Sequence, residues 1–498
     1  MKPQLLKLAP ILLSLAGGVL VALAFPPWNQ DWLIWIGFVP ALAGLILFPR
    51  HWITSLIQGA LFAGTFGGLA FSWLWAGGRP SDWAWNVGSL AVLGAIWGWF
   101  VGIFVQLPAG DDDRKVSPIL PGYGFSAGAW AKSIAHLRAA LLAAAAWTVL
   151  EWIRGVLLPE WNAVGMVLQA NLPLLQISTV TGVSGLSFVV VFANLVALIA
   201  VRRIILEPGR MTWASRFEVT STLAVIFLAA VAGFWWLEHQ PAGDHKNVAL
   251  IAPDTVDFSR LLDLSKEQSG KGIDLFVWRR VRFGPGDYAR LDDTLIGKTA
   301  GLVSGTTSGE NASLDGATIV IPGAIRNILL IPSRRDFFQP GAGATGRTLN
   351  PLEFADTSWV PLINWEAGDP RLVRAAATKQ IQVNIAIVDP LPGGPGATEQ
   401  LFANLRLWSV SFGRPLIFAS TKNLAAIVTR SGKIVAGARQ GSGMEALTGN
   451  IDVPAPLDYT LYGHFGDWFA VACGAVCLVT AFSERIRRAH EKSGRFSA

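Results

Sequence analysis

The chain has 498 residues, of which 52% are hydrophobic and 15% are charged, and 22 are tryptophan. This composition excludes an ordinary water-soluble fold for most of the chain and predicts a membrane protein. The formal net charge of +6 comes largely from basic residues between apolar runs. We find neither a basic face nor a motif that would indicate nucleic-acid binding.

Eight apolar runs are long enough to cross a hydrocarbon core of about 30 Å, which takes roughly 20 helical residues. They lie at residues 9–27, 32–49, 53–76, 84–107, 138–158, 174–201, 217–237 and 462–482. The first run follows Lys2 and Lys7, as in a secretory signal, but Phe25-Pro26-Pro27-Trp28 comes after it in place of a small-residue cleavage site. We therefore expect it to be a retained span.

Lysine and arginine concentrate in alternate loops, as at Arg50, Arg114, Arg202 and Arg485. Short cytoplasmic loops retain such residues. We therefore expect both termini in the cytoplasm, and residues 239–458 on the extracytoplasmic side of a bacterial inner membrane.

Residues 239–458 contain short β-branched runs, such as 248–251, 275–278 and 383–388, with helical stretches such as 398–411 between them. This alternation predicts an α/β domain of about 200 residues. We expect surface loops at 333–373 and 389–398, which are rich in Gly and Pro. The expected organisation is a bundle of about seven helices at 1–238, the α/β domain at 239–458, a last span at 459–484 and a basic cytoplasmic tail at 485–498.

The chain has two cysteines, Cys473 and Cys477, both in the last apolar run. They offer the α/β domain no disulfide framework and no CxxC site. We expect them to behave as small apolar residues rather than as metal ligands.

Several motifs, taken in order, resemble the apolipoprotein N-acyltransferase family of the nitrilase superfamily, membrane enzymes that acylate bacterial lipoproteins. The motifs are Phe25-Pro26-Pro27, Trp147 with Glu151 and Arg154, Trp161-Asn162, the block 182–188, and the string 460–468. The resemblance implies a polytopic helical membrane protein whose extracytoplasmic nitrilase-like αββα sandwich precedes the last span. Glu151 and Arg154 also have a plain structural interpretation, because they stand three apart on a helix and can pair with each other within a span.

The chemistry of that family needs a thiolate nucleophile, a carboxylate base and a cationic donor for the oxyanion. On this sequence the resemblance places these three positions at Ala386, Arg280 and Asn327, and a second family carboxylate near Arg335. Arginine cannot act as the base, and alanine has no nucleophile. No cysteine occurs between residues 240 and 458.

Ser333, Ser420 and Thr421 are the nearest replacement nucleophiles in the sequence, and none has a recognisable base beside it. We therefore expect no catalytic residue in the α/β domain.

Five arginines would converge if the nitrilase-like fold is kept: Arg279, Arg280, Arg282, Arg334 and Arg335. Such a cationic cleft suits an anionic headgroup or an acidic partner loop, which guanidinium groups bind in bidentate fashion. The alternative is that these arginines face solvent and pair with neighbouring aspartates, where they contribute little.

The sequence thus favours a catalytically inactive relative that serves as a structural or accessory subunit of a bacterial membrane assembly. The first alternative is an active N-acyltransferase that moves an acyl chain from phospholipid to the N-terminal cysteine of lipoproteins. The second is a module that binds lipid or lipoprotein without chemistry. In each case we expect phospholipid, other membrane proteins or lipoproteins as partners, and no cofactor.

Overall fold

The architecture comes from a computed structural model of the chain. It describes all residues except 1–2, 49–50, 108–126, 159–160, 207–212, 242, 254–256, 282, 284–285, 295–300, 307–315, 322–323, 330–350, 364–365, 389–393, 421–423, 440 and 495–498.

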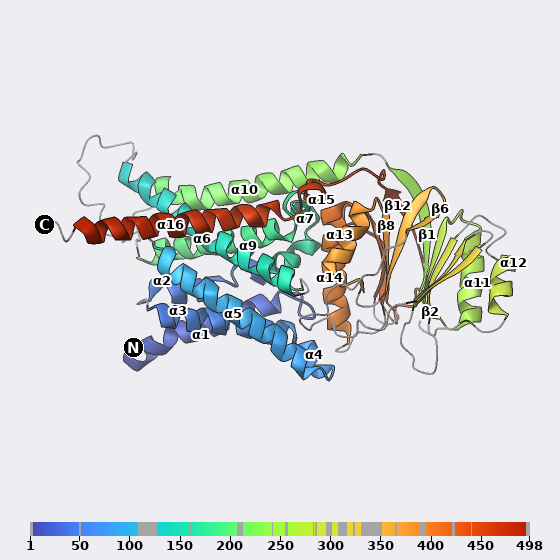
Figure 1. Ribbon diagram of the computed structural model, residues 1–498, viewed down its shortest axis with the longest axis horizontal. Helices are drawn as coiled ribbons and strands as arrows, with labels where there is room; N and C mark the ends of the chain where they lie inside the picture. Colours follow the sequence, from blue (N-terminus) through green and yellow to red (C-terminus); the bar gives the residue numbers. More distant parts are fainter. Residues whose placement is uncertain are drawn as a thin grey trace.

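A helical bundle forms one end of the molecule, and a β-domain forms the other (Figure 1). The long helices of the bundle are α1 (Pro3–Leu23), α3 (Trp52–Ala70), α5 (Pro80–Phe104), α6 (Ala127–Leu157), α9 (Val183–Leu206), α10 (Trp213–Glu238) and α16 (Trp468–Gly494). Within the described residues, all of these except α1 contain a stretch long and apolar enough to cross a membrane. Both chain termini lie at the end of the bundle that faces away from the β-domain.

The span expected at 32–49 is wrong as a single helix. The segment folds as a 3-10 turn, η1 (Asp31–Trp35), followed by the nine-residue helix α2 (Val39–Leu47). Pro40 lies in the first turn of α2, where proline is compatible with the start of a helix but not with its continuation. At 1.5 Å per residue α2 reaches about 14 Å, less than half of a hydrocarbon core.

The run expected at 174–201 is also interrupted. The short helices α7 (Leu172–Leu175) and α8 (Ser178–Thr181) occupy its beginning, and the 3-10 helix η3 (Val164–Ala170) precedes them. Gly182 then adopts a φ of +66°, which ends α8 and lets α9 start in a new direction. A similar break separates α3 from α4 (Ser72–Ala76).

Glycines let α3 and α5 pack with their backbones almost in contact. A Cβ atom added to Gly59 of α3 would lie 2.0 Å from the carbonyl oxygen of Gly94 in α5, and one added to Gly98 would lie 2.3 Å from that of Ser55. Small residues spaced four apart, as Gly94 and Gly98 are, allow this close approach between helices in a membrane.

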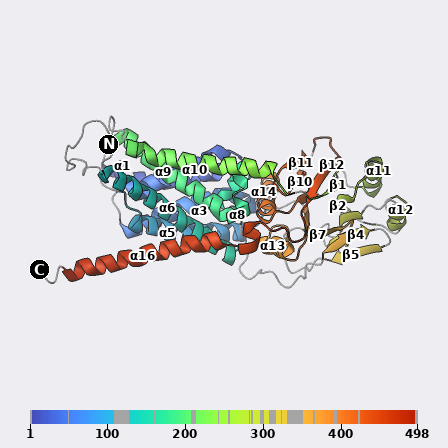
Figure 2. The same cartoon turned by 90° about the horizontal axis from the view of Figure 1, so that it is seen from above.

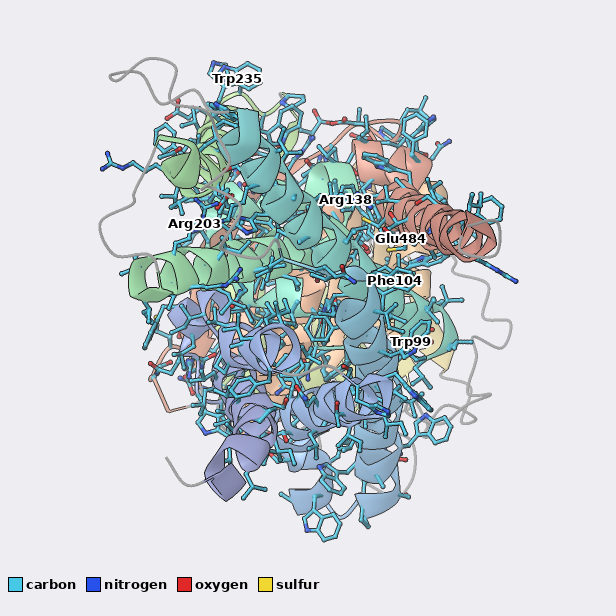
Figure 3. All side chains as sticks on the ribbon, turned by 90° about the vertical axis from the view of Figure 1, so that its left-hand side faces the viewer. Trp99, Phe104, Arg138, Arg203, Trp235 and Glu484 are labelled. Atoms are coloured by element: carbon cyan, nitrogen blue, oxygen red, sulfur yellow. The ribbon has the colours of Figure 1, made fainter. Side chains whose placement is uncertain are left out.

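A buried polar cluster ties three helices together near the end that carries the termini. Glu218 of α10 accepts hydrogen bonds from Arg203 of α9 and His136 of α6, each at 2.8 Å. Nearby, Arg138 of α6 and Glu484 of α16 lie 3.9 Å apart and side by side in Figure 3. Charges inside a helical bundle are expensive unless they face one another in this way.

Two six-stranded sheets build the β-domain, which lies between α10 and α15 (Leu461–Phe465). Sheet A has the strand order β12-β1-β2-β3-β4-β5, and sheet B has the order β11-β10-β9-β8-β7-β6. The strands of sheet A are β1 (Asp244–Ile251), β2 (Leu275–Val281), β3 (Gly301–Thr306), β4 (Gly316–Ile321), β5 (Ala324–Leu329) and β12 (Ala446–Val453). Those of sheet B are β6 (Leu352–Phe354), β7 (Thr357–Ile363), β8 (Val383–Val388), β9 (Leu416–Ser420), β10 (Leu424–Val428) and β11 (Ile434–Arg439).

Helices cover the outer faces of the two sheets. Helix α11 (Phe258–Ser269) packs on sheet A with α12 (Asp287–Thr294) beside it, and α13 (Pro370–Thr378) and α14 (Pro395–Phe412) pack on sheet B. The period-two alternation of strands divides the side chains between layers. Val277 and Ile385 fill the core between the sheets, whereas Trp278 points toward α11. The expected αββα order of layers is confirmed.

The expected loops at 333–373 and 389–398 are wrong in part. In the described part of the first segment, β6 and β7 occupy residues 352–354 and 357–363, and α13 begins at Pro370. In the second segment, α14 begins at Pro395. Pro361 lies inside β7, but β6 pairs only with residues 357–359, so the missing N–H of Pro361 costs no hydrogen bond to β6.

Helix α14 lies where the β-domain meets the bundle (Figures 1 and 2). The side-chain amide of Gln400 in α14 bonds to the bundle there. Its oxygen accepts hydrogen bonds from the indole of Trp73 and the amide of Asn162, both at 2.9 Å. Its nitrogen donates to the carbonyls of Pro26 at 2.8 Å and Ala70 at 2.9 Å. Gln400 is fully buried, and its four side-chain hydrogen bonds satisfy both donors and both acceptor sites of the amide. All four partners belong to the bundle.

We predict that Gln400→Ala destabilises the chain by about 3 kcal/mol or more, because each buried group left without a partner costs about 1 to 3 kcal/mol. The apparent melting temperature of the detergent-solubilised protein measures the effect. Gln30→Ala, at an exposed glutamine, is the matched control. Equal melting of the two variants would contradict the prediction.

Candidate functional site

The end of β2 carries the arginines expected at the family's base position. Arg279 is 2% exposed and donates through Nη1 to the carbonyl of Pro253, 3.1 Å away, just beyond β1. The hydroxyl of Ser304 in β3 donates to the carbonyl of Arg279. Arg279 is therefore buried between neighbouring strands of sheet A and is not a solvent-facing residue.

The remaining arginines of the expected cationic cleft cannot be placed with Arg279. Arg280 lies on β2, and the description of this residue is limited to its backbone. Arg282, Arg334 and Arg335 lie outside the described residues. The convergence of the five arginines stays a prediction, and so does their pairing with neighbouring aspartates. One of these aspartates, Asp274, accepts a hydrogen bond from the backbone N–H of Asn247 at 2.8 Å.

Asn327, at the expected position of the family lysine, lies on β5. The strand registers align it in one row with Thr318 of β4, Ser304 of β3 and Trp278 of β2. Three strand spacings separate the two ends of this row, which is about 14 Å. The register therefore places the backbone of Asn327 well away from the end of β2.

Ala386, at the expected position of the nucleophile, lies in the middle of β8 between Leu362 and Phe418. It is fully buried and belongs to the core under α13 and α14. Of the replacement nucleophiles, Ser420 is fully buried at the end of β9, and Ser333 and Thr421 lie outside the described residues. The position of the nucleophile is thus packed with apolar atoms.

Glu151 and Arg154 of α6 each bind a backbone group of the segment that follows the helix. Glu151 accepts the N–H of Val164 at 2.8 Å, and Arg154 donates to the carbonyl of Trp161 at 2.6 Å. Both charges therefore hold the short segment that follows the helix. The indole of Trp161 in turn donates to the carbonyl of Gly368 in the β-domain.

A cavity of about 560 Å³ opens where α14 meets the bundle. Its walls come from the segment after α1, from η3, from α14 and from β10 and β11. The cavity is lined by Arg406 of α14, which is 7% exposed and which the sequence analysis missed. Burial lowers the pKa of Arg406 to about 10, so it stays charged at neutral pH.

Two comparisons by sequence agree on one family. The family of apolipoprotein N-acyltransferase N-terminal domains matches residues 17–196. An apolipoprotein N-acyltransferase of Geobacter metallireducens is 27% identical over 249 residues. Both matches support a relationship between this chain and the apolipoprotein N-acyltransferases. The matched stretch covers 48% of this chain and 42% of that relative, so the chain spans less than half of the length of the family member that it matches.

Solved structures similar to the chain include amidases from Nesterenkonia sp. AN1. The NitN amidase is 16% identical to this chain. The match covers 42% of this chain and 93% of the amidase chain, with a TM-score of 0.32. A variant of the amidase, with the acetamide moiety of fluoroacetamide on its active-site cysteine, is 15% identical to this chain. This match covers 46% of this chain and 97% of the variant, with a TM-score of 0.34.

We predict that Ala386→Cys does not create a reactive thiol. Burial among apolar side chains raises the pKa of a thiol, and only the thiolate is nucleophilic. Maleimide labelling of the folded protein, in a background carrying Cys473→Ala and Cys477→Ala, measures the reactivity. The introduced thiol should react only after denaturation, whereas Ser442→Cys, at an exposed turn, should react at once. Rapid labelling of both variants would overturn the assignment of Ala386 to a closed core.

Proposed function

We propose that this chain is a catalytically inactive member of the apolipoprotein N-acyltransferase family and serves as a structural or accessory subunit of a bacterial membrane assembly. The observation that carries the proposal is the absence of any cysteine between residues 240 and 458. Acyl transfer through a thioester needs a thiol, and the position that the resemblance assigns to it holds the buried Ala386.

The junction between the bundle and the nitrilase-like domain supports a scaffolding role. Gln400 and Trp161 each bond across it, and α14 is buried along nearly its whole length. A domain fixed in this way presents a constant surface to a partner. In the proposed topology, both termini are cytoplasmic and the nitrilase-like domain lies outside the cytoplasmic membrane.

Apolar side chains of α10 and α16 support contact with lipid or with another membrane subunit. Phe227 and Trp235 of α10, and Leu478 and Phe482 of α16, are each more than half exposed. Trp235 projects at the rim of the bundle in Figure 3. In a membrane, such faces pack against acyl chains or against other helices. Other membrane proteins are therefore the proposed partners, with lipoproteins as a further class.

We predict no acyl transfer by the purified chain. The assay supplies an alkyne-labelled phospholipid and a peptide with an N-terminal diacylglyceryl-cysteine, and mass spectrometry follows the acyl chain. Transfer should lie at least about 10⁴-fold below that of an active family member assayed in parallel, because removal of a nucleophile costs factors of this size or more. Transfer comparable to the active enzyme, or a trapped acyl intermediate on this chain, would overturn the proposal.

We also predict that gentle extraction from the native membrane recovers the chain in stoichiometric association with another membrane protein. Mass spectrometry of a single size-exclusion peak identifies the companion, and extraction after raising the detergent concentration controls for shared micelles. Recovery of the chain alone and monodisperse would contradict the role as a subunit.

A further inference from the structure

A smaller cavity, of about 210 Å³, lies where α6, α9, α13, α14 and α15 meet. Helix α15 leads directly into α16 and lies beside α13 and α14 in Figure 1. The volume of this cavity is below the range of about 300 to 1,000 Å³ that is usual for small-molecule sites. It therefore suits a single side chain. Its lining shares no residue with the cavity at Arg406 and does not include Arg280 or Ala386.

Aromatic side chains from three helices line this small cavity. Trp152 comes from α6, Trp408 and Phe412 come from α14, and Tyr462 comes from α15. Trp408 and Phe412 are almost fully buried, so the core holds them in place. The rings of Phe412 and Tyr462 are 5.4 Å apart, a separation at which aromatic rings attract one another. The walls thus offer ring faces and edges to a further aromatic group.

Two glycines allow the walls of the cavity to approach the backbone closely. A Cβ atom added to Gly182, which has a φ of +66°, would clash with the ring of Tyr462. One added to Gly466, which has a φ of +64°, would clash with the guanidinium of Arg374. The ring and the guanidinium are therefore held against the backbone before anything binds. A preformed pocket of this kind loses little conformational entropy on binding.

The charged residues in the lining of the cavity neutralise each other. Nη1 of Arg374 lies 3.3 Å from Oδ2 of Asp467, and Tyr462 donates its hydroxyl to Oδ1 of the same carboxylate at 2.9 Å. A charged occupant would have no counter-charge, which is costly in a partly buried site. The charge of the lining thus complements a neutral group. Each carboxylate oxygen has a second lone pair, so Asp467 can also accept an N–H from that group.

The surface beside the cavity is apolar and exposed. Val156, which lines the cavity, and Leu157 lie at the end of α6, and Leu461 and Phe465 lie on α15. These four side chains are between 47% and 71% exposed. Helix α16, which follows, carries the exposed apolar side chains that the proposed function assigns to a membrane partner. A pocket that continues such a surface is the usual place for a side chain that contributes much of the binding energy of an interface.

We propose that this cavity receives a tryptophan side chain of a membrane protein partner. The inference rests on the proposed function, because it names the contact by which the subunit binds its companion. Tryptophan provides a neutral ring for the aromatic walls and an N–H that Asp467 can accept. It is also enriched where membrane helices leave the bilayer, the level that the proposed topology gives to the end of α6 and the start of α16. A lipid acyl chain provides neither the ring nor the donor.

The probe for the cavity is N-acetyl-5-fluorotryptophanamide, added to the full chain in lipid nanodiscs and followed by fluorine NMR. Empty nanodiscs correct for partition of the indole into lipid. We expect saturable binding. The corresponding 4-fluorophenylalanine amide has a ring but no N–H, and it should bind about 3-fold to 10-fold more weakly, because a hydrogen bond to the carboxylate is missing. Equal binding of the two amides would contradict the choice of tryptophan.

Val156→Trp places the chain's own indole at the cavity and should weaken binding of the probe by about 10-fold or more, because the pocket is then filled. Val92→Trp on α5 is the matched control, since Val92 is 61% exposed and Val156 is 59% exposed. It should leave binding unchanged. Val156→Ala also alters the cavity wall, but it leaves the space open and should keep the binding of the wild type.

The same variants are then extracted gently from the native membrane. The companion that accompanies the wild type should be lost from Val156→Trp and retained by Val92→Trp. The docking inference alone would fall if the probe shows no saturable binding, as when acyl chains fill the cavity, or if Val156→Trp binds the probe or retains the companion as the wild type does. A wild type recovered without any companion would contradict the proposed function, and this inference with it.

Discussion

The buried amide of Gln400 joins the helical bundle to the β-domain through four hydrogen bonds. Its four hydrogen bonds reach the turn after α1, the end of α3, α4 and the segment after α6. These segments are irregular, and irregular backbone inside protein is stable only when its polar groups are bonded. The position of α14 therefore determines how the end of the bundle is closed, and α14 in turn supports sheet B.

The need to bond this irregular backbone explains why charged side chains also lie where the bundle meets the β-domain. Glu151 and Arg154 fix the segment before η3, and Gln169 at the end of η3 holds Arg406. The cavity at Arg406 exists because the bundle and sheet B cannot fill every space between two curved surfaces.

Composition alone predicted the long apolar helices, because twenty apolar residues have few other stable environments. Periodicity predicted β1, β2, β8 and the body of α14. The sequence failed where contacts made outside an element decide its form. The segment 333–373 was expected to be a loop, yet β6 and β7 form within it, and β6 pairs only with residues before Pro361. The sequence analysis did not single out Arg406, because its burial depends on the bundle, which covers the face of α14 that a separate domain would leave in water. The assignment of the family positions to Arg280, Asn327 and Ala386 rests on resemblance and stays a prediction, because motif spacing does not determine side-chain geometry.

The connection from α10 to β1 is short. Helix α10 ends at Glu238 and β1 starts at Asp244, and β1 lies between β12 and β2 inside sheet A. Strand β12 leads through α15 to α16, so two neighbouring strands are attached to two helices whose apolar stretches are largely exposed. A change in bilayer thickness that tilts α10 relative to α16 would therefore pull β1 and β12 in different directions. The hydrogen bonds between these two strands would oppose the tilt, so sheet A would limit the relative motion of the two helices.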